Sequence, residues 1–350
     1  MDFVPVRNVL VCMNDTRGLA DFSSALFSLN PDLKVYASDS NSAYFKDRDA
    51  SFFSSQDLRP GVIHSDLYGM ISRLYDGGFD LVVADLPGHP GSLQDISIYP
   101  HALLRLSGKM FGSCASVADP GQYGPLLMML EKGKYKTGVA SLSLDDRLLM
   151  ASAVFKSTSG YDRCIARYIE SQPVAGGDVP VSSVIFSLNS SSVSPEHVDD
   201  LKRNSVKLID SDGQGCLEGG RAVDLRSLFG LGDVSQGLVR LHPSVLLSLM
   251  GSHGEVVDML CADLPHVMPY CVSSRSEAQK LVDVGTVAMI RSAASNHRRA
   301  VVLSAELHHY LLSDKIFSSQ SRYDLAVGAF FAVADYDARI SRLFDGLLKN

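Results

Sequence analysis

The chain has 350 residues, of which 46% are hydrophobic and 20% charged, a composition typical of a globular protein with a full core. A net charge of −7 and a pI near 5.8 argue against a general nucleic-acid-binding or anionic-membrane surface. Because the sequence has no signal-like N-terminus, no membrane-length apolar run and no paired cysteine motif, we expect a cytoplasmic protein with reduced thiols.

The first third of the chain alternates short apolar runs with one helical pattern. Residues 8–12 and 35–37 are predicted strands, and residues 19–29 carry apolar side chains at helical spacing. A loop and a helix are predicted for 61–74. The continuous apolar run at 81–84 is typical of a strand inside a parallel sheet. This order predicts an open parallel α/β sheet flanked by helices, with polar loops at the carboxyl ends of its strands.

An internal repeat divides the chain. The sequence F-D-L-V-V-A-D-L-P at 79–87 returns as V-D-M-L-C-A-D-L-P at 257–265. Two sets of residues on amphipathic helical patterns also recur at the same spacing: Arg147, Ala151, Phe155, Tyr161, Asp162, Ile165 and Arg167, then Arg322, Ala326, Phe330, Tyr336, Asp337, Ile340 and Arg342. We therefore predict two tandem copies of one domain, at 1–172 and 181–350, joined by a Pro/Gly linker at 173–180.

The second copy is expected to repeat the elements of the first. Strands are predicted at 184–188, 206–209 and 257–262, with a helix at 195–203. The stretch 283–297 then reads D-V-G-T-V-A-M-I-R-S-A-A-S-N-H, a small-residue helix that begins after a turn and ends in polar residues.

That stretch resembles the signature D-I-G-G-P-T-M-L-R-S-A-A-K-N-H of the IMP cyclohydrolase domain of the bifunctional purine-biosynthesis protein. The resemblance implies a methylglyoxal-synthase-like fold, here as two tandem open parallel sheets flanked by helices, each with a helical C-terminal extension. Within the signature, Arg291, Asn296 and His297 are expected to bind substrate. Asp283 is kept as a catalytic candidate, whereas the family's lysine is Ser295 here.

Several loops resemble the substrate-binding loops of that family. The family's S-x-S-D-K-T-G aligns with residues 12–18, which makes Asn14, Asp15, Thr16 and Arg17 candidates for binding a phosphate ahead of a helix. The family's S-T-G-G-T loop aligns with 38–42 and 210–214. An aspartate has entered each of these loops, and a carboxylate repels phosphate. Ordinary polar turns explain them equally well.

A third loop of the family, G-R-V-K-T-L-H-P-K-V-H-G-G, aligns with residues 237–245. Arg240 replaces the lysine as a catalytic candidate, His242 is kept, and His64 is its counterpart in the first copy. Both histidines are candidates for substrate binding, although packed histidines and solvated arginines are commoner.

The catalytic set of the family is incomplete in each copy. The tyrosine of its N-L-Y-P-F motif is missing, because both copies read Asp-Leu-Pro, at 85–87 and 263–265. The second copy keeps the signature's aspartate, Asp283. The first copy has Ser97 at that position and keeps the lysine, Lys109. This complementary loss suggests a composite site in which Lys109 meets Asp283, although independent decay of both copies explains the same pattern.

Three functions agree with these patterns. The first is ring closure of formyl-AICAR to IMP, in which positioning, a group that stabilises the oxyanion and a proton shuttle suffice without metal or organic cofactor. The second is a non-catalytic nucleotide-binding relative that acts as partner subunit of a purine enzyme. The third is another small-phosphate enzyme on the same scaffold. The expected ligand is a purine nucleotide, formyl-AICAR or IMP, and the copies are expected to mimic a dimer within one chain, with a homodimer also possible.

Overall fold

The computed structural model describes residues 3–53, 70–71, 73–88, 99–180, 183–186, 207–210, 221–222, 259–268, 272, 274–298, 301–303 and 316–349. His64, Arg240, His242 and the helix predicted at 195–203 lie outside these residues. We call residues 1–172 the first half and residues 181–350 the second half.

A five-stranded parallel sheet forms the centre of the first half. Its strands run in the order β4-β3-β2-β5-β6, and a short antiparallel pair, β1-β7, lies apart from it. Their bounds are β1 Val4–Pro5, β2 Asn8–Cys12, β3 Lys34–Ser38, β4 Ala50–Phe53, β5 Leu81–Ala84, β6 Ala115–Val117 and β7 Ser141–Leu142. The predicted open parallel sheet is therefore confirmed.

Helices cover both faces of this sheet, because successive side chains of a strand point to opposite faces and both sets are apolar here. In β2, Val9 and Val11 pack with α1 and α4, whereas Leu10 and Cys12 pack with α3 and α5. The helices are α1 Leu19–Leu29, η1 Asp39–Tyr44, α3 Tyr99–Lys109, η4 Pro120–Gln122, α4 Tyr123–Thr137 and α5 Leu144–Glu170.

The second half contains a parallel sheet with the corresponding strand order, β11-β10-β9-β12-β13, and an antiparallel pair, β14-β8. The strands are β8 Val179–Pro180, β9 Ser183–Phe186, β10 Lys207–Asp210, β11 Arg221–Ala222, β12 Met259–Cys261, β13 Val301–Leu303 and β14 Ile316–Phe317. The described helices are α10 Arg275–Leu281, α11 Gly285–Ser295 and α13 Ser319–Leu347.

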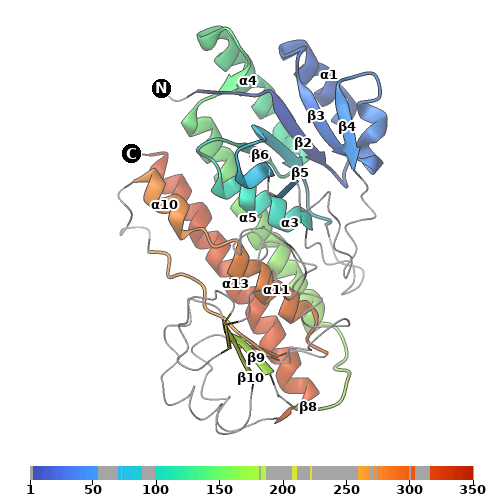
Figure 1. Cartoon of the computed structure of the whole chain (residues 1–350), viewed down its shortest axis with the longest axis vertical. Helices are drawn as coiled ribbons and strands as arrows, with labels where there is room; N and C mark the ends of the chain where they lie inside the picture. Colours follow the sequence, from blue (N-terminus) through green and yellow to red (C-terminus); the bar gives the residue numbers. More distant parts are fainter. Residues whose placement is uncertain are drawn as a thin grey trace.

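The two halves meet through their longest helices. Figure 1 shows α5 and α13 side by side between the two sheets, with α3 and α11 packed against them. One apolar core runs from the first sheet through these four helices to β12, and it includes Phe155 of α5 and Phe330 of α13. Helix α5 begins at a capping box in which Ser143 and Asp146 satisfy each other's backbone N–H groups. The halves are therefore joined by a buried helical junction.

Among the helices that the structure describes, none is long and apolar enough to cross a membrane. The described cysteines Cys12, Cys114, Cys164 and Cys261 carry free thiols.

Candidate functional site at the junction of the two halves

Lys109 and Asp283 lie together, although they come from different halves. Lys109 is the last residue of α3, and Asp283 lies in the turn that precedes α11. The Lys109 Nζ donates a hydrogen bond of 2.7 Å to the carbonyl oxygen of Val282, the residue before Asp283. The Asp283 carboxylate is close enough for its charge to favour the protonated form of Lys109. The structure thus brings together the two residues that the composite-site hypothesis pairs.

The turn around Asp283 is held from several sides. Its Oδ1 accepts a 2.9 Å hydrogen bond from the N–H of Thr286, which caps the first turn of α11. The Tyr336 hydroxyl accepts from the N–H of Asp283 at 2.8 Å and donates to the carbonyl of Leu281. Arg105 Nη2 donates to the Asp283 carbonyl at 2.8 Å. These contacts fix the position of the carboxylate relative to Lys109.

The surroundings of Lys109 shift its pKa in opposing directions. Burial lowers the pKa of Lys109 below its ordinary value, the Asp283 charge opposes that shift, and the Arg105 guanidinium adds to it. An ammonium group has three donors, and the described contacts use one of them, on the Val282 carbonyl. A lysine in this state can donate a hydrogen bond to a developing oxyanion or transfer a proton.

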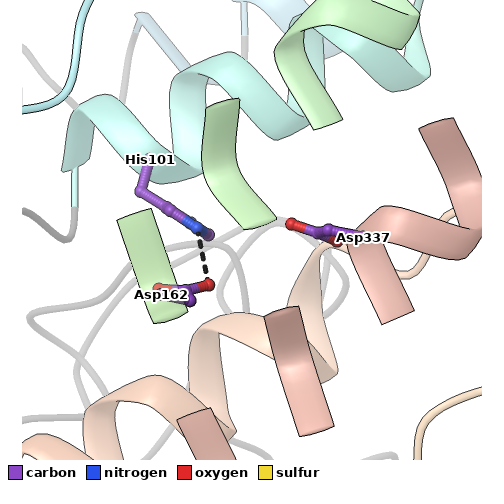
Figure 2. A group of neighbouring side chains, drawn as sticks. All are labelled: His101, Asp162 and Asp337. Atoms are coloured by element: carbon purple, nitrogen blue, oxygen red, sulfur yellow. Dashed lines mark hydrogen bonds and ion pairs between the residues drawn. The ribbon is translucent and has the colours of Figure 1, made fainter. Parts of the chain in front are cut away.

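Two ion pairs cross the same junction. Arg105 of α3 pairs with Asp337 of α13, and Arg291 of α11 pairs with Asp162 of α5 at 2.7 Å. All four side chains are 1% exposed or less. His101 Nε2 adds a second contact to Asp162 at 3.1 Å, as Figure 2 shows. Each half therefore supplies the arginine that neutralises an aspartate of the other half.

His101, Asp162 and Asp337 also have the spacing of a metal site, since one ligand atom from each lies within 4.8 Å of the others. Two guanidinium groups already neutralise the two carboxylates. Burial and the Arg291 charge lower the pKa of His101 to about 3, so the imidazole is neutral in this cluster. A divalent cation would meet two buried positive charges here, and we therefore assign the cluster a structural role.

The predicted phosphate loop of the first half binds a carboxylate of the chain itself. Asp85, in the loop after β5, accepts hydrogen bonds from the backbone N–H groups of Asn14 at 2.6 Å and Asp15 at 2.7 Å. Asn14 Nδ2 donates to the same carboxylate at 3.0 Å. Arg17 pairs with Asp15, and the carbonyl of Thr16 accepts from the N–H of Leu19 at the start of α1. All four candidate residues thus lie at the carboxyl edge of the first sheet.

The remaining described candidates lie along α11 and at its end. Arg291 reaches into the junction through its pair with Asp162. Asn296 caps α11, and its N–H donates to the carbonyls of Ser292 and Ala293. His297 is buried, its Nδ1 contacts the carbonyl of Ala294, and its own carbonyl accepts from Arg322 Nε. These hydrogen bonds of the three residues involve neither Lys109 nor the Asp283 carboxylate.

Sequence reasoning did not assign roles to His101, Arg105, Asp162, Asp337 or Tyr336 at this junction. A signal was present, because Asp162 and Asp337 interrupt the apolar faces of two amphipathic helices. A carboxylate on a buried helix face needs a charged or hydrogen-bonding partner. The packing of the two halves identified these partners.

No family model matches the chain. It is similar to the bifunctional purine biosynthesis protein PurH of Rhodopirellula baltica, with 27% identity over 52% of this chain and 39% of that protein. The PurH protein of Mesorhizobium japonicum is 28% identical over 47% of this chain and 35% of its own length. The match thus spans less than half of these relatives. The crystal structure of ForH overlaps 47% of this chain and 97% of its own at 20% identity, with a TM-score of 0.36.

Proposed function

We propose that the protein acts in purine biosynthesis as an IMP cyclohydrolase-like enzyme that closes formyl-AICAR to IMP at one composite site. The observation that carries this proposal is the contact of Lys109 with the Asp283 turn across the junction. Similarity to PurH proteins over half of the chain supports the connection to purine biosynthesis. The chain's own Asp283, Lys109 and Arg240 are the catalytic residues of the proposed site, and His242 is proposed to contact its substrate.

The geometry of a helix explains why one copy alone cannot form such a site. In the resembling signature, the aspartate and the lysine are twelve residues apart at opposite ends of one helix, about 18 Å along its axis. Here that helix is α11, which begins next to Asp283 and ends at Ser295. The lysine at the site must therefore come from the other copy, and Lys109 ends the corresponding helix α3. The reciprocal site would have Ser97 in place of the aspartate and Ser295 in place of the lysine, and neither serine is charged.

The proposed reaction needs few chemical groups. The carboxamide nitrogen of formyl-AICAR bonds to the formyl carbon and loses one proton. The former formyl oxygen takes up two protons and leaves as water, while the formamide nitrogen gives up its proton and forms a C=N double bond to the same carbon. The Lys109 ammonium stabilises the charge that develops on that oxygen and supplies a proton. Asp283 keeps Lys109 protonated in the ground state and accepts a proton from the attacking nitrogen. The substrate itself holds nucleophile and electrophile close together, so positioning provides much of the rate.

We also propose that 1–172 and 181–350 are diverged tandem copies of one methylglyoxal-synthase-like domain, related by a pseudo-twofold axis through the junction. The common strand order of the two sheets supports this relation. So do the crossed Arg–Asp pairs, in which corresponding residues exchange partners. A third support is the matching set of carbonyls that two corresponding arginines bind: Phe111, Gly112 and Leu142 for Arg147, and His297, Arg298 and Phe317 for Arg322.

The test is an assay of the purified chain with formyl-AICAR, in which ultraviolet absorbance reports IMP. Lys109→Met and Asp283→Asn should each lower kcat by about 100-fold or more, the usual contribution of a positioned acid or base. Asp283→Asn keeps an oxygen that can cap α11, so the loss would not reflect a missing helix cap. Ser295→Ala, at the reciprocal position, is the matched control and should leave kcat unchanged. Equal activity of all three variants would remove the composite site.

The alternative is a non-catalytic, nucleotide-binding partner subunit of a purine enzyme. The observation in its favour is the loss of the family's catalytic tyrosine, since proline follows Asp-Leu in both halves. In that case the wild-type chain would show no turnover of formyl-AICAR, while IMP or AICAR would still raise its melting temperature.

A further inference from the structure

The carboxyl edge of the first sheet contains a second group of polar residues, separate from the Lys109–Asp283 pair. Register places them at one level, because Cys12 pairs with Ala84 in β5 and Val83 pairs with Val117 in β6. Asn14, Asp85 and Asp119 lie one or two residues after the ends of β2, β5 and β6. We call Asn14, Asp15, Asp85, Asp119 and Tyr123 the first edge.

At the first edge, Asp85 occupies the position that an anionic ligand would take. Asp85 is only 5% exposed, and its carboxylate accepts two hydrogen bonds from Asn14 and one from Asp15. Backbone N–H groups that converge before a helix are a common way to bind phosphate. Because the carboxylate already uses these donors and carries negative charge, a phosphate group there would lose the hydrogen bonds and be repelled.

Tyr123 supplies the observation that points to a ligand. Its ring stacks on Phe22 of α1 at 4.1 Å between ring centroids. Its Cδ2 lies 3.8 Å from the point that a Cβ would occupy if Gly18, at the beginning of that helix, carried a side chain. The residue is 6% exposed, yet its buried hydroxyl has no hydrogen-bond partner in the described part of the chain. Burial and the charges of Asp85, Asp15 and Asp119 raise the pKa of this hydroxyl, so it remains protonated and faces carboxylates.

A ligand hydroxyl fits these groups better than an oxyanion does. It can accept a hydrogen bond from Tyr123 and donate one to a remaining lone pair of Asp85 or Asp119. A phosphate at neutral pH mainly accepts, and it would place negative charge beside three carboxylates of which one, Asp15, is paired with Arg17. The groups that suit a ligand hydroxyl at this edge therefore disfavour a phosphate.

We propose that the first edge binds an uncharged, hydroxyl-bearing ligand of the nucleoside class, and that Asp85 excludes the phosphorylated form. The choice of a nucleoside rests on the proposed purine function, whereas the exclusion of phosphate rests on the contacts of Asp85 and Tyr123. One chain would then bind a nucleotide at the composite site and a nucleoside at the first edge.

Equilibrium dialysis of the full chain against labelled inosine and labelled IMP tests this assignment, since the two probes differ only by the phosphate. The wild-type chain should bind inosine, and Tyr123→Phe should weaken inosine binding about tenfold or more without changing IMP binding. Asp85→Asn removes the charge and should add one IMP site per chain.

Asp80→Asn is the matched control. Asp80 also accepts from two backbone N–H groups, those of Arg7 and Asn8, but at the opposite end of the same sheet. This variant should leave the binding of both probes unchanged. A change as large as that in Asp85→Asn would show that any lost carboxylate in this sheet has the same effect, and it would overturn the assignment.

Two further results would overturn the proposal: no binding of inosine to the wild-type chain, or inosine binding that Tyr123→Phe leaves intact. IMP formation from formyl-AICAR is measured separately on the same preparations. Its absence would remove the proposed enzymatic function and leave the inosine result standing. Normal IMP formation without inosine binding would remove only the present inference.

Discussion

The two ion pairs that cross the junction share one framework and differ in their second partner. Asp162 accepts from Arg291 and His101, whereas Asp337 accepts from Arg105 and Thr158. Both additional partners come from the first half. At the corresponding positions of the second half the sequence has Val287 and Val333, which cannot donate.

This difference teaches that the arginine alone does not satisfy a buried carboxylate. Each aspartate here has two side-chain donors, because an ionised carboxylate that loses water needs hydrogen bonds on both oxygens. Asp162 uses the imidazole of His101, which can take up a proton in acid. Asp337 uses the hydroxyl of Thr158, which cannot. The two pairs should therefore respond differently to mutation and to acid.

The largest effect is expected when one aspartate is removed. Asp337→Ala leaves the Arg105 guanidinium buried without its counter-charge, which should lower the free energy of unfolding by about 3–5 kcal/mol in urea titrations at pH 7. The double variant Arg105→Met/Asp337→Leu removes both charges and should recover most of that loss. If the double variant is as unstable as the single one, the charge imbalance is not the cause.

Acid should destabilise the Asp162 pair through His101. The pKa of His101 is lowered to about 3 in the folded chain from an ordinary 6.5, so this histidine contributes stability that is complete above pH 6.5. As the pH falls below 6.5 the unfolded chain takes up a proton first, and stability should decrease by up to about 1.4 kcal/mol per pH unit. Urea titrations between pH 7 and pH 5 measure this slope.

His101→Leu is the control for that slope. It should lower the slope of the free energy of unfolding against pH by up to about 1.4 kcal/mol per pH unit, the contribution of one proton. It should also lower stability at pH 7, since Asp162 loses a donor. His297 also has a lowered pKa because of burial, so part of the slope should remain in this variant. An unchanged slope would mean that His101 is already protonated in the folded chain.

Removing the hydroxyl of Thr158 should have a smaller effect. Thr158→Val keeps the shape of the side chain but deletes the hydrogen bond to Asp337, which should cost about 2 kcal/mol, as expected for a bond to a charged group. Thr158→Ser keeps the hydroxyl and should cost less. Burial raises the pKa of Asp337 and the Thr158 hydrogen bond lowers it, so Thr158→Val should raise that pKa further, and its loss of stability should become smaller as the pH falls.

The smallest effect is expected at the solvent-facing margin of the same helices. Arg163 of α5 pairs with Asp335 of α13 at 2.8 Å, but the two side chains are 40% and 59% exposed. Arg163→Ala should change the free energy of unfolding by less than about 1 kcal/mol. A larger loss would show that the charge at the margin of the junction is as important as the buried pairs.

Much of the secondary structure of the first half was predictable from local patterns. The strands at 8–12 and 81–84 and the helix at 19–29 have the predicted bounds, and the strand predicted at 35–37 extends by one residue at each end. In the second half, the strand predicted at 257–262 is described at Met259–Cys261. Periodicity is local, so neighbouring residues were enough to reveal it.

The candidate site was predictable only as a set of alternatives. The loss of a lysine at Ser295 and the survival of one at Lys109 suggested a composite site, but decay of both copies gave the same pattern. No local pattern indicated that Asp85 accepts the hydrogen bonds of the first-half loop, because Asp85 and Asn14 are 71 residues apart in the chain.

The sequence by itself determined the alternation of strands and helices in the first half and the two helices with an aspartate on their apolar face. Tertiary structure decided which residues meet: Lys109 with the Asp283 turn, Arg105 with Asp337, and Arg291 with Asp162. The reason is physical. Hydrophobic periodicity is encoded within one or two helical turns, whereas the partner of a buried charge is set by the packing of elements more than a hundred residues apart.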